Sequence, residues 1–101
     1  MATSKEYKSY IQEQLELLGD IRIRAMMGEY LIYYQDKLFG GIYDNRFLVK
    51  ITKESKKIMS EAKEEIPYPG AKPMLLVENI EDREFLKELV CKMCENLPQK
   101  K

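Results

Sequence analysis

The chain has 101 residues, a length that suits one domain rather than two. Lysine plus arginine and aspartate plus glutamate both number 17, so the formal net charge is zero. This balance argues against a dedicated nucleic-acid-binding protein, whose affinity comes largely from clustered cations. No apolar run is long enough to predict a transmembrane helix or a secretory signal. We therefore expect a cytoplasmic protein in which residues 1–98 form one domain and 99–101 a frayed tail.

The first predicted element is a helix that begins at Thr3 and ends at Gly19. Thr3 and Glu6 fit a capping box, with Thr3 as the N-cap residue. Gly19 is a suitable residue to end the helix. An apolar stripe at helical spacing predicts packing against a sheet. The stripe consists of Tyr7, Tyr10, Ile11, Leu15 and Leu18.

Four short runs of alternating apolar and polar residues follow the helix. They span Ile21–Met26, Glu29–Tyr34, Lys37–Tyr43 and Arg46–Ile51. Alternation with period two is typical of strands, because successive side chains point to opposite faces of a sheet. The intervening residue pairs, of which Asp44-Asn45 best suits a tight turn, predict hairpins. The sequence thus predicts a four-stranded antiparallel meander.

Both faces of this meander carry large side chains, which is more than a sheet with one solvated face requires. Either helices cover both faces, or one face is an exposed aromatic surface that meets a partner. Gly40-Gly41 within the third strand indicates a bulge, a bend or the close approach of another group. Of these we favour strong curvature of the sheet around a packed helix.

The second half of the chain predicts a short helix, a loop, a strand and a long helix. Thr52 and Asn79 are the expected N-cap residues of the two helices, and Pro98 is expected to stop the second. The loop spans residues 66–73, where Pro69-Gly70 suits a type II turn, and the strand spans Met74–Glu78. The predicted order α-β-β-β-β-α-β-α describes an α+β domain with an antiparallel sheet of about five strands flanked by helices.

Residues suited to catalysis or metal binding are few. The chain contains no histidine, so Ser-His and Cys-His nucleophile systems are excluded. Cys91 and Cys94 form a CxxC pair, but a zinc site needs four ligands, and a helix C-terminus disfavours thiolates. We interpret them as ordinary thiols, with redox chemistry or an intermolecular metal as the alternative. We expect neither an enzyme nor a cofactor or metal.

Charged and aromatic side chains of the meander have two interpretations each. Arg22 and Arg24 share one strand face, where pairing with Glu29 or Asp36 is favoured over recognition of an anion. The aromatic residues are favoured as core or interface residues over a stacking platform for nucleobases. They are Tyr30, Tyr33, Tyr34, Phe39, Tyr43 and Phe47.

Several segments resemble the N-terminal domain of the TfoX/Sxy family of bacterial competence regulators. The resemblance rests on Arg24–Gly28, Ile32-Tyr33, Phe39, Ile42, Asp44, Phe47–Lys50 and Lys72–Met74. It extends from about Ile21 to Leu89, with Met27 in place of the usual Phe and Glu29 in place of a common Gly. It implies a secretion-chaperone-like α+β fold and a non-enzymatic, protein-interacting domain. The motif residues that it marks for possible interaction are Arg24, Met26, Gly28, Tyr33, Phe39, Lys50, Lys72, Pro73 and Met74.

Three functions follow as hypotheses. The first is a stand-alone, single-domain interaction module linked to transcription or competence, with a protein partner or a second copy as its ligand. The second is a weak nucleic-acid-binding domain that uses a basic sheet face. Its cations would be Arg22, Arg24, Lys37, Arg46 and Lys50. The third is a small-anion-binding protein, with a pocket between the sheet and loop 66–73 lined by Arg24 and Tyr68.

Overall fold

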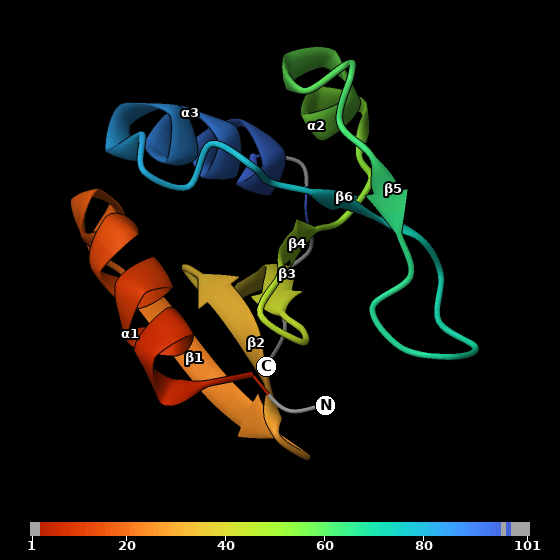
Figure 1. The fold of residues 1–101 in the computed structure, drawn as a ribbon. Coiled ribbons are helices and arrows are strands. Elements are labelled where there is room, and N and C mark those ends of the chain that lie inside the picture. The colour runs from red at the N-terminus through yellow and green to blue at the C-terminus, as the bar shows by residue number, and fades with distance from the viewer. Residues whose placement is uncertain (1–2, 96, 98–101) are drawn as a thin grey trace.

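The computed structural model describes residues 3–95 and 97. These residues form an α+β domain in which one antiparallel sheet carries the helices, and the order of elements is the predicted one with one strand added (Figure 1). The predicted stop at Pro98 and the tail 99–101 lie outside the described residues.

The first helix, α1 (Lys5–Gln14), continues into a 3-10 turn, η1 (Glu16–Leu18). Gly19 ends η1 with a φ of 84°, a conformation that glycine adopts without strain. The prediction of Thr3 as the N-cap residue of α1 is wrong by one position. The N-cap is Ser4, whose hydroxyl accepts a hydrogen bond from the Tyr7 amide at 3.2 Å. The Thr3 hydroxyl instead donates to the Glu29 carboxylate at 2.7 Å and so ties the N-terminus to the sheet.

The sheet has six strands in the spatial order β1-β2-β3-β4-β6-β5. The bounds are β1 (Ile21–Met26), β2 (Glu29–Tyr34), β3 (Lys37–Ile42), β4 (Phe47–Val49), β5 (Glu64–Glu65) and β6 (Met74–Leu76). The predicted meander is confirmed, with β3 and β4 shorter than expected, and β6 is the predicted later strand. The two-residue strand β5 was not expected, because two consecutive glutamates show no apolar alternation.

Three tight turns join the strands of the meander. Both central residues of each turn have a positive φ, as type I′ hairpins require. The six residues are Met27, Gly28, Gln35, Asp36, Asp44 and Asn45. Gly28, Asp36, Asp44 and Asn45 tolerate the left-handed region better than most residues do, and this preference explains why the sequence marked the breaks correctly.

Two further helices complete the fold. Helix α2 (Lys53–Ile58) begins at the predicted cap Thr52, which forms a capping box with Ser55. Helix α3 (Arg83–Cys94) begins later than predicted, because the Asp82 carboxylate, and not Asn79, caps it by accepting from the Phe85 amide at 3.1 Å. Asn79 instead accepts the Asp82 amide through its backbone carbonyl, in the turn before the helix.

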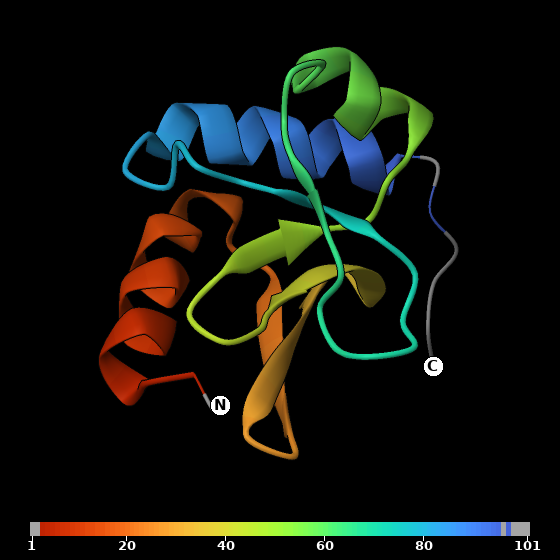
Figure 2. The same ribbon diagram turned by 45° about the vertical axis from the view of Figure 1, so that its right-hand side comes forward.

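The helices pack on one face of the sheet. Ile11 of α1, Leu15 at the end of α1, and Leu89 and Met93 of α3 join one buried core with strand residues such as Ile32. Cross-strand pairs such as Ile42 with Phe47 and Val49 with Leu75 place these core residues on the same side of the sheet. Figure 2 shows α3 above the sheet, with the loop between β5 and β6 below it. Among residues 3–95 and 97, no helix covers the opposite side of the sheet, here called the outer face.

The glycine pair in β3 marks both a bulge and close contacts. The register shifts between Ile32 and Tyr33, and Phe39 is left unpaired and fully buried in the core. A Cβ on Gly40 would collide with the Leu48 carbonyl of β4. A Cβ on Gly41 would lie 2.9 Å from the ring of Tyr43, which therefore rests on the sheet where a side chain is missing.

Candidate functional site

The outer face of β1, β2 and β3 is partly apolar and open to solvent. Cross-strand pairing places Arg24 beside Leu31, Arg22 beside Tyr33, and Tyr33 in turn beside Leu38. Leu31, Tyr33 and Leu38 are half-buried, whereas both arginines are exposed. At the tip of the β1–β2 hairpin Met27 is 98% exposed, which is unusual for a large apolar side chain.

The polar contacts of this region follow one of the predicted pairings and not the other. Arg22 forms the expected ion pair with Asp36, with 2.7 Å between Nη1 and Oδ1, and both side chains are largely exposed. The Glu29 carboxylate accepts from the amide and hydroxyl of Thr3 and from the Asp44 amide. Glu29 thus joins the N-terminus and two hairpins, and the predicted pairing of this residue with the β1 arginines is wrong.

A groove of about 670 Å³ lies between loop 66–73, strand β3 and the residues that follow β4. We call it the loop groove. Its lining is largely apolar and includes two lysines, and its described lining residues contain no carboxylate. The lining consists of Leu38, Gly40, Tyr43, Lys50, Ile51, Pro67, Tyr68, Ala71, Lys72, Pro73 and Met74.

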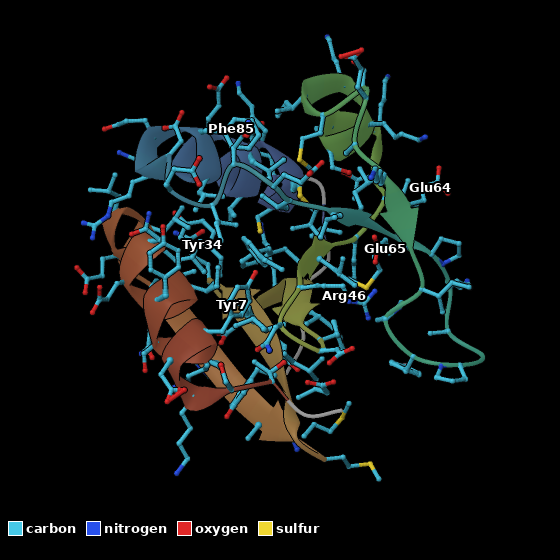
Figure 3. The ribbon with its side chains drawn as sticks, viewed as in Figure 1. Tyr7, Tyr34, Arg46, Glu64, Glu65 and Phe85 are labelled. Carbon is cyan, nitrogen blue, oxygen red and sulfur yellow. The ribbon has the colours of Figure 1, made fainter. Side chains whose placement is uncertain are left out.

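Arg46 holds the loop against the sheet. Its Nη1 lies 2.6 Å from Glu65 Oε1, and the guanidinium also donates to the carbonyls of Ile66 and Pro67, at 3.5 and 3.4 Å. The Nε of the same residue donates to the Tyr43 carbonyl at 3.1 Å. Figure 3 shows Arg46 beside Glu65 next to the start of the loop. Sequence reasoning missed this contact, since nothing in the sequence relates position 46 to the unpredicted strand β5.

Two tyrosines form one wall of the loop groove. The rings of Tyr43 and Tyr68 lie 6.1 Å apart and are tilted by 49°. Tyr43 is buried, whereas Tyr68 is 53% exposed. Burial, followed by the proximity of Tyr68, raises the pKa of the Tyr43 phenol above its usual value. The Tyr43 ring in this wall is therefore neutral at neutral pH.

The structure brings together four of the nine predicted interaction residues. Lys50, Lys72, Pro73 and Met74 all line the loop groove, although Lys50 and Lys72 are 22 positions apart in the sequence. Of the remaining five, Tyr33 lies on the outer face and Phe39 in the core, and three lie at or near the hairpin tip. These three are Arg24, Met26 and Gly28.

Two of the predicted sites do not match the geometry. Arg24 is not among the described lining residues of the loop groove, because it projects from β1 beside Leu31. The five cations expected on one sheet face are dispersed as well. Lys37 donates to the Cys94 carbonyl at 2.7 Å, and Arg46 is bound to Glu65. Only Arg22 and Arg24, of these five, lie together on β1.

The cysteines lie where α3 ends. Cys91 is half-buried with its Sγ 4.0 Å from the Tyr34 hydroxyl, and Cys94 is buried, both as free thiols. Burial raises the pKa of Cys94 to about 11, so this thiol stays protonated at neutral pH, in agreement with an ordinary buried thiol.

Within residues 3–95 and 97 no group of three or more acidic or cysteine side chains is arranged to hold a metal ion. The helices of this part of the chain are too short or too polar to cross a membrane.

Comparison with known proteins adds two findings. A family model described as the TfoX N-terminal domain matches residues 13–94. The chain is also similar to an uncharacterized 12.7 kDa protein from the trpE 5′ region of Spirochaeta aurantia. The two sequences are 31% identical over 80 residues, which cover 79% of this chain and 70% of that protein. The family match spans α3 and all six strands, and includes both the outer face and the loop groove.

Proposed function

We propose a function from the premise that this chain belongs to the TfoX N-terminal domain family. The domain acts in the regulation of transcription, as the competence regulators of this family imply, and it does so by binding another protein rather than by catalysis. The observation that carries this proposal is the asymmetry of the sheet. The helices cover one face, while the outer face presents half-buried apolar side chains next to an exposed methionine hairpin tip.

The chemistry of the outer face favours a partner different from this chain. Leu31 and Tyr33 offer apolar contact area, and Arg22 and Arg24 flank them on the neighbouring strand. A symmetric contact between two copies would place the same patch on both sides and oppose these arginines. Like charges that face each other across an interface oppose association. The partner that suits this face is a protein with an apolar patch flanked by carboxylates.

Site-specific photocrosslinking in the native host tests this proposal. Benzoylphenylalanine replaces Tyr33 on the outer face in one variant and Leu17 in another. Leu17 is a suitable control because it is 44% exposed and lies in η1, among the helical elements. We expect a specific adduct from position 33, identified by mass spectrometry, and no such adduct from position 17. The additional change Arg24→Glu should weaken formation of the adduct, because it removes a cation next to the apolar patch.

Three results would contradict the proposal. One is the absence of any adduct from position 33, and another is an identical set of adducts from both positions. The third is an adduct whose mass corresponds to two copies of this chain, since it would assign the outer face to self-association. Circular dichroism of each variant verifies that the substitutions leave the fold intact.

A further inference from the structure

We infer that the free edge of β1 binds an extended segment of the partner protein as an added strand of the sheet, and that this segment alternates apolar with acidic residues. Recognition of this kind extends a sheet through backbone hydrogen bonds and is called β-augmentation. The inference rests on the proposed function, because the same partner supplies the segment. It adds where and by which contacts that partner is bound.

The two edges of the sheet differ in how far they allow further pairing. β1 and β5 are the outermost strands (Figure 1). β5 has two residues, both glutamates, and Pro67 follows soon after it. A short, charged edge strand next to a proline is a common protection against the addition of another strand. β1 has six residues, contains no proline and pairs with β2 without a bulge, so it offers the length of backbone that an added strand requires.

The hydrogen-bond pattern identifies which backbone groups of β1 point away from β2. The Gln35 amide donates to the Asp20 carbonyl at 3.1 Å, so these two residues form a hydrogen-bonded pair. Such pairs alternate with non-hydrogen-bonded pairs along an antiparallel ladder, so the even-numbered residues of β1 bond to β2. The odd-numbered residues, whose amides and carbonyls point outward, are Ile21, Ile23 and Ala25. Within residues 3–95 and 97 these outward groups form no hydrogen bond.

Arg24 specifies an acidic residue in the added strand. Its side chain is exposed on the outer face and, among the described residues, takes part in no ion pair, whereas Arg22 is already paired with Asp36. Because the Arg24 backbone bonds to β2, its neighbour in an added strand would form a non-hydrogen-bonded pair with it, in which the two side chains lie closest. A carboxylate at that position stabilises the sheet as a cross-strand pair of opposite charge.

Ile21 and Ile23 specify apolar residues at the alternate positions. Both are half-buried and pack against the core, and Ile23 lies opposite the core residue Ile32 on the face that the helices cover. An apolar side chain beside them would cover their remaining exposed surface and remove it from water. The added strand therefore needs apolar residues on one face and acidic residues on the other, which is the alternation that we infer for the partner.

The same arginines oppose pairing between two copies of this chain. In antiparallel pairing of β1 with itself, the outward groups meet only when odd-numbered residues lie opposite odd-numbered residues. Pairing centred on Ile23 would then place Arg22 of one copy opposite Arg24 of the other. Like charges directly opposite each other destabilise a sheet. The charge of this edge therefore favours a different, acidic chain.

Titration of the whole chain with synthetic peptides, followed by two-dimensional NMR, tests the inference. The probe is an end-capped peptide of alternating valine and glutamate, and the matched control carries lysine in place of glutamate. We expect the glutamate peptide to bind more tightly and to slow hydrogen exchange at the amides of Ile21, Ile23 and Ala25. The amides of Arg22 and Arg24 already bond within the sheet, so their exchange should change less.

Two variants test the charge and the backbone separately. Arg24→Glu should weaken binding of the glutamate peptide about fivefold and strengthen binding of the lysine peptide, because it reverses the sign of the cross-strand charge pairs. The control Lys87→Glu makes the same change in charge on the exposed side of α3 and should alter neither affinity. Ala25→Pro removes an outward amide that makes no bond to β2, and it should abolish binding of both peptides. The spectrum of each variant without peptide verifies its fold.

Several results would overturn the inference. They are equal affinity for the two peptides, equal effects of the Arg24 and Lys87 variants, slowed exchange confined to other elements, and unchanged binding by a folded Ala25→Pro variant. Slowed exchange at the same amides that rises with protein concentration, without peptide, would assign the edge to self-pairing. A partner that binds the outer face alone would still form the adduct at position 33. Absence of that adduct would refute the proposed function, so the two failures are distinguishable.

Discussion

The Glu29 carboxylate provides the most direct test of how this fold is held together. It accepts from the Thr3 hydroxyl at 2.7 Å, from the Thr3 amide at 3.2 Å, and from the Asp44 amide at 3.2 and 3.0 Å. One side chain thus connects the N-terminal segment, the β1–β2 hairpin and the β3–β4 turn. We expect Glu29→Ala to destabilise the domain and Glu29→Gln, which retains an acceptor oxygen, to destabilise it less.

The size of the effect follows from what each donor retains. The Thr3 amide still reaches the Gly28 carbonyl at 3.3 Å, and the exposed Asp44 amide can bind water. The largest loss is at the buried Thr3 hydroxyl, because a hydrogen bond to a charged group contributes about 1.5–3 kcal/mol to stability. Because Glu29 is only half-buried, we expect a loss of about 1–2 kcal/mol for the alanine variant. For a domain of this size that corresponds to a decrease in Tm of roughly 5–15 °C.

Urea denaturation followed by circular dichroism measures this loss. Glu88→Ala is the matched control, because Glu88 is an exposed glutamate on α3, and its free energy of unfolding should change by less than about 0.5 kcal/mol. If Glu29→Ala were no more destabilising than the control, or less so than Glu29→Gln, the carboxylate would not connect the three segments as described.

Three further predictions concern the loop, the glycine pair and the thiols. Arg46→Lys loses the forked contacts to Glu65 and the loop carbonyls, so amide hydrogen exchange across residues 66–73 should accelerate; unchanged exchange would contradict this. Gly41→Ala places a methyl group 2.5 Å from the Tyr30 carbonyl of β2, so the free energy of unfolding measured in urea should fall by about 1–3 kcal/mol. A decrease below about 0.5 kcal/mol would refute the close contact. Half-buried Cys91 should react with iodoacetamide at pH 8 well before Cys94, whose raised pKa and burial both oppose attack; equal rates by peptide mapping would disprove this order.

Local sequence signals predicted most of the secondary structure. Alternation located β1 and β2 to the residue, because side-chain direction in a strand depends only on position parity. Turn residues such as Asp44-Asn45 marked the hairpins, since their tolerance of positive φ is an intrinsic property. Helix starts were less accurate at Thr3 and Asn79. Each has a capping alternative nearby, Ser4 and Asp82. The Thr3 hydroxyl is bound instead to the distant Glu29, whereas Asn79 lies in a turn whose carbonyl accepts the Asp82 amide.

The candidate site depended on contacts between residues far apart in the chain. Arg46 reaches Glu65 across 19 positions, and Glu29 reaches Thr3 across 26. No periodicity or local preference encodes such pairs, so the sequence suggested Arg46 as a nucleic-acid contact and Glu29 as a partner of the β1 arginines. The same reasoning correctly expected a pocket beside loop 66–73 with Tyr68 in its wall, yet placed Arg24 in its lining, where the structure has Lys50 and Lys72.

The sequence by itself determined the meander, the helices, the hairpin turns and membership of the family, because alternation, capping residues and short motifs are local properties. Only the tertiary structure decided which sheet face the helices cover, and with it which aromatic residues are core and which are surface. It also decided that Lys50 and Lys72 share one groove. Both outcomes follow from the packing of elements distant in sequence, where burial of one face leaves the other face available for binding.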